Sequence, residues 1–268
     1  MSLAPRLPAH AESTVHQFLR AHALPPRSEG VVIGLSGGID SALVARLAVD
    51  ALGADRVLGV LLPDRQFPPA LVTETEEYAR ALGMATRLYP IDAIEDAVRA
   101  LFPEVRDVAT WGNVKSRARM IVLYTLAREQ RRLVVGTGNK SELLLGYFTK
   151  YGDGGVDLLP IGDLYKTEVR ALAHRLGLPR AILERAPTAG LWEGQTDEAE
   201  LGAPYADLDR VLRGLEELRS TLEIARATGF PEAEVARIEA RVAAHRHKRR
   251  PPPIPKIGLR TLGIDWRD

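Results

Sequence analysis

The stretch GVVIGLSGGIDSALVARLAVDAL, residues 30–52, decides how the chain folds. Residues 30–35 form a short, continuous apolar run, as expected of a strand that is buried on both faces. Residues 41–52 have helical spacing, and two adjacent glycines lie between the two segments. Because glycine lacks Cβ, backbone N–H groups at this point can approach an anion closely, and the helix N-terminus adds its positive dipole end. The stretch therefore predicts a phosphate-binding loop between a strand and a helix.

The loop itself, Ser36-Gly37-Gly38-Ile39-Asp40-Ser41, also has a simpler interpretation, because a glycine turn capped by Ser or Asp is common at helix starts. The complete strand–SGGxDS–helix context favours the phosphate site. It matches neither the GxxxxGK[ST] pattern of a Walker loop nor the GxGxxG pattern of a dinucleotide fingerprint. Ser36 and Ser41 would add hydroxyl donors, and Asp40 is suited to hold a metal that bridges phosphates.

Apolar runs of strand length alternate with helical spacing along most of the chain. Further strands are expected at residues 57–62, 85–89 and 133–136. Helices are expected at residues 11–22, 71–82, 91–101, 114–130, 141–145, 167–176, 205–218 and 232–245. This alternation predicts an α/β fold with a doubly wound parallel sheet flanked by helices. Residues 146–157 and 186–203 have no regular period, and loops of that length are usually functional.

The composition is that of an ordinary globular protein, with 46% hydrophobic and 26% charged residues in 268. We expect a single domain over residues 1–268, with a basic, Pro-rich tail at 245–268. Lys and Arg total 36 against 35 for Asp and Glu, so no general nucleic-acid surface is expected. The absence of cysteine excludes thiolate chemistry and fits a reducing compartment. With no signal-peptide pattern and no membrane-length apolar run, a cytoplasmic protein is expected.

Several ordered segments carry a family resemblance. SGGIDS resembles the pyrophosphate-binding loop of N-type ATP pyrophosphatases, which cleave ATP to AMP and pyrophosphate while they adenylate a substrate. Within that group, the other segments resemble those of ammonia-dependent NAD synthetases. They are GNVKSRARM (112–120), GTGNKSE (136–142), GYFTKYGDGGVD (146–157), residues 160–166, PTA (187–189) and DEAELG (197–202). The resemblance runs from about residue 34 to 248 and implies a Rossmann-like fold.

The resemblance implies an ATP site at the carboxyl edge of the sheet. The implied ATP contacts are Gly34, Leu35, Ser36, Gly37, Gly38, Ile39, Asp40, Ser41, Thr137, Lys166 and Thr188. It also implies that Asp40 and Glu142 hold Mg²⁺, an ion that prefers hard carboxylate oxygens when it is bound with phosphates. From the residues alone, Thr137 has a less favoured alternative as a helix cap, whereas Glu142 fits equally well as a complement to a helix dipole and Lys166 as a surface lysine.

The resemblance further implies a deamido-NAD site. Its implied contacts are Arg117, Lys150, Asp157, His247 and Lys248. Asp153 is implied to lie near the carboxylate that is amidated and, with Lys166, to be catalytic. The residues alone leave alternatives open, because Arg117 also fits a solvated helix charge. The tail HRHKRRPPP also fits a nucleic-acid patch or a solvated terminus.

The implied activity is amidation of deamido-NAD with ammonia through an adenylated intermediate, with release of AMP and pyrophosphate. Glutamine-dependent members carry an additional domain with a catalytic cysteine, for which this chain has neither the length nor a cysteine. Ammonia is therefore expected to be free or to come from a separate amidase partner. The family also implies a homodimer. Residues 114–130 are the expected contact, although the apolar face of this helix also fits the core.

Two departures from the family pattern affect the loops. Residues 63–69 read PDRQFPP where the family often has LPxxxQ followed by acidic residues, so Arg65 and Gln66 receive no ATP role. PTAGL has Gly190 where Asp is common, which indicates a more flexible loop, and residues 186–203 resemble a lid. Two rival functions remain. A tRNA-modifying ligase or another pyrophosphatase needs a different acceptor site, and a non-catalytic nucleotide sensor does not need Asp40 and Glu142.

Overall fold

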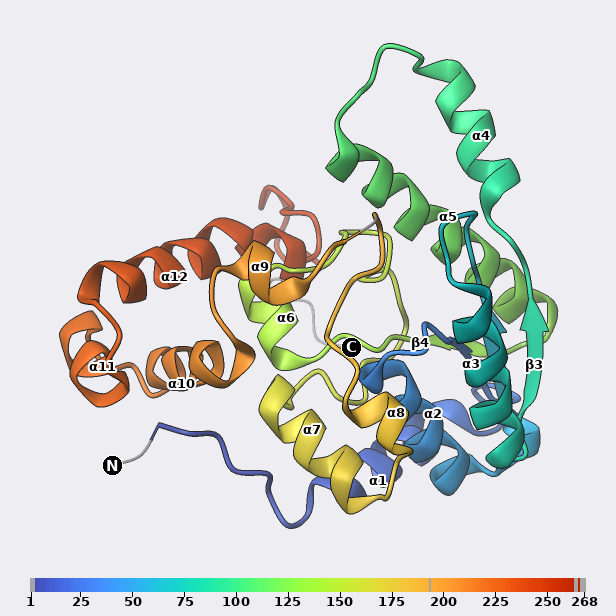
Figure 1. Ribbon diagram of the computed structural model, residues 1–268, viewed down its shortest axis with the longest axis horizontal. Coiled ribbons are helices and arrows are strands. Elements are labelled where there is room, and N and C mark those ends of the chain that lie inside the picture. The colour runs from blue at the N-terminus through green and yellow to red at the C-terminus, as the bar shows by residue number, and fades with distance from the viewer. Residues whose placement is uncertain (1–2, 193, 263–264, 266–268) are drawn as a thin grey trace.

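The computed structural model describes residues 3–192, 194–262 and 265 (Figure 1). Among these, four parallel strands form one sheet in the order β3-β2-β1-β4. They are β1 (Val31–Gly34), β2 (Val57–Leu61), β3 (Ala85–Leu88) and β4 (Leu133–Val135). Since the order reverses between β1 and β4, the carboxyl ends of these strands border the crevice where open α/β sheets bind ligands. The expected parallel sheet is confirmed. Residue 193 of the expected lid and residues 263–264 and 266–268 of the tail lie outside the described part.

Helices cover both faces of the sheet (Figure 1). In chain order the described helices are α1 (Ala11–Ala23), α2 (Ile39–Leu52), η1 (Ala54–Arg56), α3 (Pro69–Ala81), α4 (Asp92–Leu101), α5 (Val108–Glu129), α6 (Lys140–Leu145), α7 (Lys166–Arg175), α8 (Arg180–Leu183), α9 (Asp197–Leu201), α10 (Tyr205–Glu216), α11 (Thr221–Thr228), α12 (Glu232–Ala244) and η2 (His245–Arg249). Alternate residues of β1 face opposite layers. Val31 and Ile33 pack with α1, α2 and α7, whereas Val32 packs with α5. Burial on both faces explains the continuous apolar run.

Local capping accounts for two of the differences from the expected helices. Helix α5 begins at Val108 and not at residue 114, because the Asp107 side chain accepts a hydrogen bond from the amide of Thr110 at 2.8 Å. Helix α11 was not expected, although Ser220 and Glu223 form a capping box at its start. Helix α9 also corrects the expectation that residues 186–203 are irregular throughout.

Three C-terminal helices, α10, α11 and α12, form an arm that extends away from the sheet (Figure 1). Their apolar residues, among them Leu208, Ile224 and Ile238, build a second core. Leu145 at the end of α6 and Tyr165 just before α7 are buried in that core. The arm therefore fixes the two helices, α6 and α7, that begin beside the phosphate loop.

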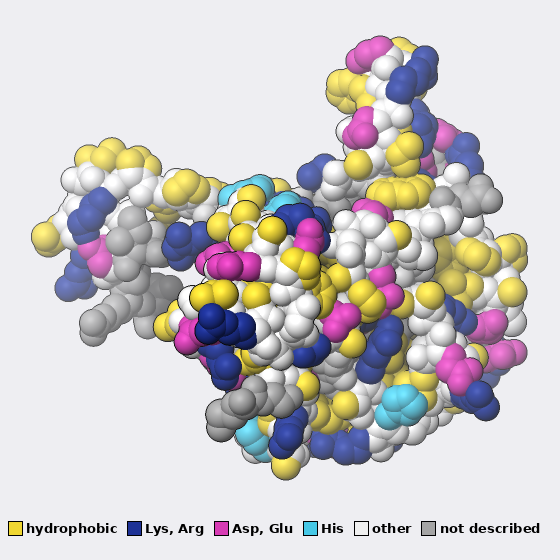
Figure 2. Space-filling model, turned by 60° about the vertical axis from the view of Figure 1, so that its left-hand side comes forward, with side chains coloured by type: hydrophobic (Ala, Val, Ile, Leu, Met, Phe, Trp, Pro, Cys, Tyr) yellow, Lys and Arg dark blue, Asp and Glu magenta, His cyan; other side chains and the backbone are white. Residues whose placement is uncertain are grey.

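The surface has no dominant charge on the face seen in Figure 2, where acidic and basic side chains are interspersed. The segment that stands highest there, α4 with the start of α5, mixes apolar and charged side chains. Within the described residues, no helix combines the length and the apolar character that a membrane crossing requires.

Candidate active site

The loop predicted from SGGIDS lies at the carboxyl end of β1 and leads directly into α2. The amide of Leu35 continues the strand ladder by donating to the carbonyl of Val60 at 2.8 Å. The Ser41 hydroxyl donates to the Gly38 carbonyl at 3.0 Å and accepts from the Ser36 amide at 3.3 Å, so it braces the loop from within. Gly38 is the N-cap of α2, and no side chain caps this helix. The simpler interpretation, a turn capped by Ser or Asp, is therefore wrong.

A buried lysine connects this loop to a later helix. Lys166 is only 2% exposed, and its Nζ lies 2.5 Å from Oδ2 of Asp40 and 3.2 Å from Oε1 of Glu142. The three residues lie in the first turns of α7, α2 and α6, respectively. The alternative of a surface lysine is wrong. The structure brings together the two carboxylates expected to bind Mg²⁺ and the lysine expected to contact ATP, while the binding roles stay predictions.

Burial and charge act in opposite directions on this group. Burial by itself lowers the pKa of Lys166, but the adjacent Asp40 and Glu142 carboxylates outweigh it and hold the pKa above its ordinary value. Burial raises the pKa of Glu142, an effect that Lys166 opposes and the negative charge of Asp40 reinforces. Lys166 is consequently a permanent cation beside the loop, suited to neutralise charge that develops on a phosphate.

Asn139, which sequence reasoning did not single out, positions both carboxylates. Its side chain caps α6 by accepting from the Glu142 amide at 3.1 Å, and its Nδ2 donates to Oδ1 of Asp40 at 2.9 Å. Glu142 completes the capping box through the Asn139 amide, so it also stabilises the helix start. The interpretation of Thr137 as the cap is therefore wrong. The Asn-x-x-Glu spacing was the available signal in the sequence.

Asp209 is a second supporting residue that the sequence did not reveal. It is fully buried on α10, where it accepts from the Ser141 hydroxyl at 2.5 Å and from the Thr167 amide at 2.9 Å. Ser141 in turn accepts from the Lys166 amide at 2.9 Å. One carboxylate on the arm thus holds the starts of α6 and α7 together. No local pattern predicts this contact, because Asp209 and Ser141 are 68 positions apart.

The glycine-rich segment 146–157 folds around Asp153. Its Oδ1 accepts from the Thr149 amide at 2.9 Å and from the Ser116 hydroxyl at 2.8 Å, which ties the segment to α5. Asp153 is exposed, but the protein packed around its carboxyl group raises the pKa of that group above its ordinary value. The hydrogen bonds from Thr149 and Ser116 act in the opposite direction and are outweighed. The contacts fix the position of Asp153; its role at the amidated carboxylate stays a prediction.

The basic tail folds back onto the same segment through η2. The Nζ of Lys248 donates to the carbonyl of Gly146 at 2.7 Å, and the Nζ of Lys150 donates to the carbonyl of His247 at 3.0 Å. The alternative of a freely solvated terminus is wrong for η2, because its residues are anchored to the protein. The return of His247 and Lys248 to this side of the molecule agrees with the expected substrate site, although contact with deamido-NAD stays a prediction.

Arg117 and Asp157 border the same segment and have partners within the protein. Arg117 is exposed on α5 and donates to the carbonyl of Lys150 at 3.3 Å. Asp157 accepts from the Tyr124 hydroxyl at 3.0 Å and from the Val134 amide at 2.8 Å, so it closes the free edge of β4. Both therefore have a structural role beside the predicted one.

The two predicted threonines lie in different segments of the chain, one after β4 and one between α8 and α9. Thr137 is the second residue after the end of β4 and is half-buried. Thr188 is exposed in the segment between α8 and α9, where its hydroxyl donates to the Gln195 carbonyl at 2.7 Å. Gly190 has φ 61°, in the left-handed region that favours glycine.

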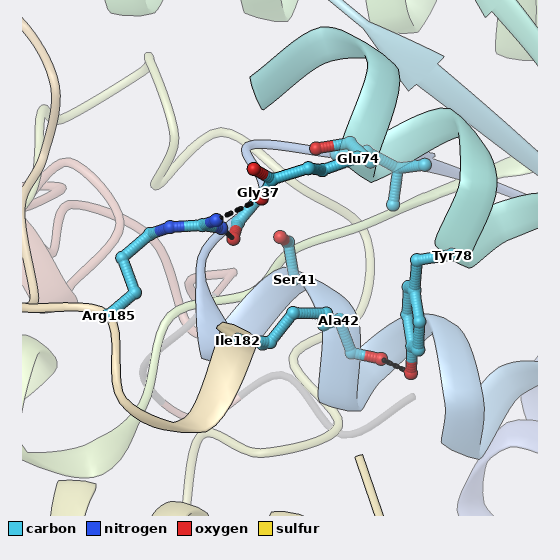
Figure 3. A pocket seen from close by; sticks show the side chains of 9 residues that line it. Gly37, Ser41, Ala42, Glu74, Tyr78, Ile182 and Arg185 are labelled. Carbon is cyan, nitrogen blue, oxygen red and sulfur yellow. Dashed lines mark hydrogen bonds and ion pairs between the residues drawn. The ribbon is translucent and has the colours of Figure 1, made fainter. Parts of the chain in front are cut away.

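Two cavities adjoin these residues. One of about 20 Å³, room for roughly one water, lies between the phosphate loop, α3 and α8. Figure 3 shows Arg185 reaching across it to the Gly37 carbonyl and to Glu74, whose carboxylate is 2.5 Å away. The other, of about 460 Å³, is lined by Lys150 and Lys248 together with aromatic and tail residues. The larger cavity is on the side of the predicted deamido-NAD contacts.

The fold and the site together define the class. An open parallel sheet with a glycine loop and a helix N-terminus at its switch point is the architecture of nucleotide-binding α/β proteins. The family model for NAD synthase matches residues 12–252, and the chain belongs to this family.

Individual relatives agree with the family assignment. The NH3-dependent NAD+ synthetase of Methanosarcina acetivorans is 46% identical over 250 residues, which cover 92% of this chain and 98% of that protein. Among solved structures, the NH3-dependent NAD synthetase of Campylobacter jejuni has a TM-score of 0.78 at 31% identity, with 92% and 97% of the two chains covered. The NMN synthetase of Francisella tularensis has a TM-score of 0.82 at 32% identity, with 94% and 100% covered. The family and fold class predicted from the motifs are confirmed.

Proposed function

We propose that this chain catalyses the ATP-dependent amidation of deamido-NAD with ammonia. The observation that carries the proposal is the 46% identity to an NH3-dependent NAD+ synthetase across 98% of its length. First, a carboxylate oxygen of deamido-NAD attacks the α-phosphorus of ATP, and the bond to pyrophosphate breaks. Ammonia then attacks the acyl carbon, the bond to AMP breaks, and the nitrogen releases a proton. Adenylation is needed because AMP is a much better leaving group than a carboxylate oxygen.

The geometry around Lys166 supports the first step. Its ammonium is buried, charged and adjacent to the loop at residues 36–41. A preorganised cation of this kind stabilises the charge that moves onto pyrophosphate in a transfer at phosphorus. Asp153, held by Ser116 and Thr149, is proposed to act on the acceptor side. We assign ATP to the loop, Thr137 and Thr188, and deamido-NAD to the residues that face segment 146–157 and η2.

We place Mg²⁺ at Asp40 and Glu142. Both carboxylates contact the Nζ of Lys166, at 2.5 and 3.2 Å, so an ion bound there would share them with the ammonium, and magnesium bound with phosphates takes one or two protein carboxylates. Within the described residues no group of three or more acidic, His or Cys side chains is arranged to hold a metal, so the phosphates would complete the coordination. When bound, the ion neutralises phosphate charge. Asn139 orients the Asp40 carboxylate for this role.

A second acceptor has support from one comparison. The Francisella structure, an NMN synthetase, covers 94% of this chain. Deamido-NMN, the mononucleotide counterpart, is therefore a second candidate substrate. The higher identity to NAD+ synthetases and the 460 Å³ cavity beside Lys150 and Lys248 favour the dinucleotide. Rates with the two acceptors at equal concentration decide the question, and we expect kcat/KM to be higher with deamido-NAD.

We also propose that two copies of the chain pair through α5. Helix α4 and the start of α5 project from the sheet (Figure 1), and this region exposes Leu101, Phe102 and Val108, while Ile121 is exposed further along α5. Neighbouring exposed apolar side chains of this kind are typical of protein interfaces.

The proposed nitrogen source is free ammonia, with delivery by a separate amidase as the alternative, and the proposed location is the cytoplasm.

Isotope transfer tests the proposed chemistry. Deamido-NAD with an ¹⁸O-labelled carboxylate is converted with unlabelled ATP, Mg²⁺ and ammonium, and the AMP is analysed by mass spectrometry. We expect one ¹⁸O atom in the phosphate of AMP, because the carboxylate oxygen stays on phosphorus when ammonia displaces AMP. Unlabelled AMP alongside the amide product would rule out the adenylated intermediate.

A further inference from the structure

Lys115 is a buried cation on α5 to which the mechanism above assigns no part. The residue is 4% exposed. Its Nζ lies 2.8 Å from Oδ2 of Asp64, 2.9 Å from Oε1 of Gln66 and 3.0 Å from the carbonyl oxygen of Leu191. An ammonium group has three N–H donors, which equals the number of these oxygen neighbours. Asp64 and Gln66 belong to the loop between β2 and α3, whereas Leu191 belongs to the loop between α8 and α9. We call these the first loop, residues 62–68, and the second loop, residues 184–192 and 194–196.

Both loops adjoin the phosphate loop. The first loop leads into α3, whose Leu71 lies so close that a Cβ on Gly37 would approach its Cδ1 to 2.5 Å. The second loop begins beside Arg185, which donates to the carbonyl of Gly37. From there it crosses towards α5 and returns to α9 (Figure 1). It ends at Asp197, which is buried and feels the charge of Lys166.

The second loop is seated on α5 by packing as well as by the ammonium. A Cβ on Gly112 would lie 3.1 Å from Leu191 and 3.3 Å from the ring of Trp192, so the absence of a side chain at Gly112 makes room for the loop. The Leu191 amide donates to Oε1 of Gln195 at 2.8 Å, which braces the loop internally. The loop therefore reaches Lys115 in a defined conformation.

We infer that Lys115 is a positioning residue that couples the two loops, so that both are ordered together beside the phosphate loop. A lysine that contacted one loop alone would stabilise that loop and leave the other unchanged. Arg119, one turn further along α5, has this simpler arrangement. Its Nε donates to the carbonyl of Leu62 at 3.1 Å and its Nη2 lies 3.6 Å from Asp64, both in the first loop. Arg119 is thus a matched control on the same helix.

Hydrogen exchange tests the coupling in the absence of substrates. The Gln66 amide, which donates to Oδ1 of Asp64 at 2.9 Å, reports on the first loop, and the Leu191 amide reports on the second. We expect Lys115→Met to speed exchange about tenfold or more at both amides, because an ion pair and two hydrogen bonds from a charged group are lost. Arg119→Met is expected to speed exchange in the first loop only. Unchanged exchange of the second loop in Lys115→Met, or equal effects of the two substitutions on both loops, would overturn the inference.

A second variant separates coupling from loss of fold. Lys115→Met leaves the buried Asp64 carboxylate with a weaker partner, so Lys115→Met/Asp64→Asn removes the charge pair as a unit. Faster exchange of both loops in this double variant, with a cooperative thermal transition retained, supports coupling. Wild-type exchange of the second loop in the folded double variant contradicts it.

The kinetic consequence rests on the proposed function, since it requires turnover of ATP. We expect Lys115→Met to raise KM for ATP about tenfold, with a smaller change in kcat, because the catalytic groups on α2, α6 and α7 are untouched. An unchanged KM for ATP would contradict a positioning role. If the wild-type chain does not turn over these substrates, the proposed function fails, while the exchange experiment still decides whether the loops are coupled.

Discussion

Lys166 is buried and charged, a combination that lysine seldom shows without partners. Its two carboxylate partners keep it protonated, and each also has a second contact, Asp40 with Asn139 and Glu142 with the start of α6. The residue is therefore part of the fold as well as of the proposed chemistry. A cation held in this way needs no rearrangement when charge develops on a phosphate nearby.

Replacement of Lys166 by Met is expected to lower kcat about 100-fold or more, because one preorganised charge contact in the transition state is lost. The free energy of unfolding should fall by about 3–5 kcal/mol, since two partly buried carboxylates lose their partner. Steady-state kinetics and urea denaturation measure the two effects. Lys140→Met is the control, because Lys140 pairs with Glu216 and the exposed Asp163. An equal loss of kcat in both variants would contradict the assignment.

Asp64 predicts a pH dependence of stability. Burial alone raises its pKa, but hydrogen bonds from Lys115 and the Gln66 amide, with the charges of Lys115 and Arg119, bring the pKa below its ordinary 3.8. Because the folded pKa is below the unfolded one, Asp64 stabilises the fold above the unfolded value and loses this effect as the pH falls through the folded value.

The decline of unfolding free energy from about pH 5 to about pH 3 should therefore be shallower in Asp64→Asn than in the wild type. Urea denaturation at a series of pH values gives both curves. Parallel curves would mean that Asp64 has the same pKa in the folded and unfolded chain.

At the scale of elements, α2 begins and ends next to glycines with positive φ, and they differ in their surroundings. Gly37 has φ +75°, and a Cβ there would lie 2.5 Å from Leu71 and 2.8 Å from Thr75. Gly53 has φ +87° with nothing within 4 Å. The first glycine therefore allows a close approach of α3 to the phosphate loop, whereas the second only ends a helix.

Gly53→Ala is expected to lower the free energy of unfolding by about 1–2 kcal/mol through backbone strain alone. Gly37→Ala should lower it further, because Leu71 and Thr75 must move, and it should also weaken ATP binding. Urea denaturation and titration calorimetry with ATP give the comparison. Equal stability losses, together with unchanged ATP affinity in Gly37→Ala, would show that the loop has no such packing requirement.

The sequence was most informative where one local pattern decides an element. The apolar runs of β1 and β2 and the SGGIDS loop fall where expected, because burial on both faces and the missing Cβ act within a few residues. Helix α5 begins before the expected residue 114, because its start depends on the Asp107 cap and not on the apolar period. Contacts such as Asp209 with Ser141, or Lys115 with Leu191, depend on packing between distant segments, and no local pattern encodes them.

At the scale of the whole molecule, the proposed pairing through α5 makes a direct prediction. Ile121 is 51% exposed on this helix, and Ile121→Lys would place a charge in the apolar contact. We expect the wild type to sediment as a dimer and this variant as a monomer in analytical ultracentrifugation. Leu218→Lys is the control, since Leu218 is 92% exposed and comes two residues after α10, a helix of the arm. A wild-type monomer, or equal effects of the two substitutions, would contradict the pairing.

The function of the whole molecule was predictable from the sequence because several motifs, in the order typical of the family, extend over about residues 34–248. So many ordered matches do not arise by chance. The way in which the arm holds α6 and α7 could not be predicted from the sequence, since the arm has no motif of its own. Helices α10 and α12 could be expected from their periodicity, but not α11 or the direction in which the three helices pack.

The most direct test of the central claim is an assay that mixes the chain with deamido-NAD, ATP, Mg²⁺ and ammonium and quantifies NAD, AMP and pyrophosphate. The account predicts equal amounts of all three products. It also predicts that they are lost in Asp40→Asn and retained in Asp50→Asn, a substitution on the same helix that breaks only an exposed pair with Arg46. AMP and pyrophosphate without NAD would move the acceptor elsewhere, and ATP binding without any product would contradict the account.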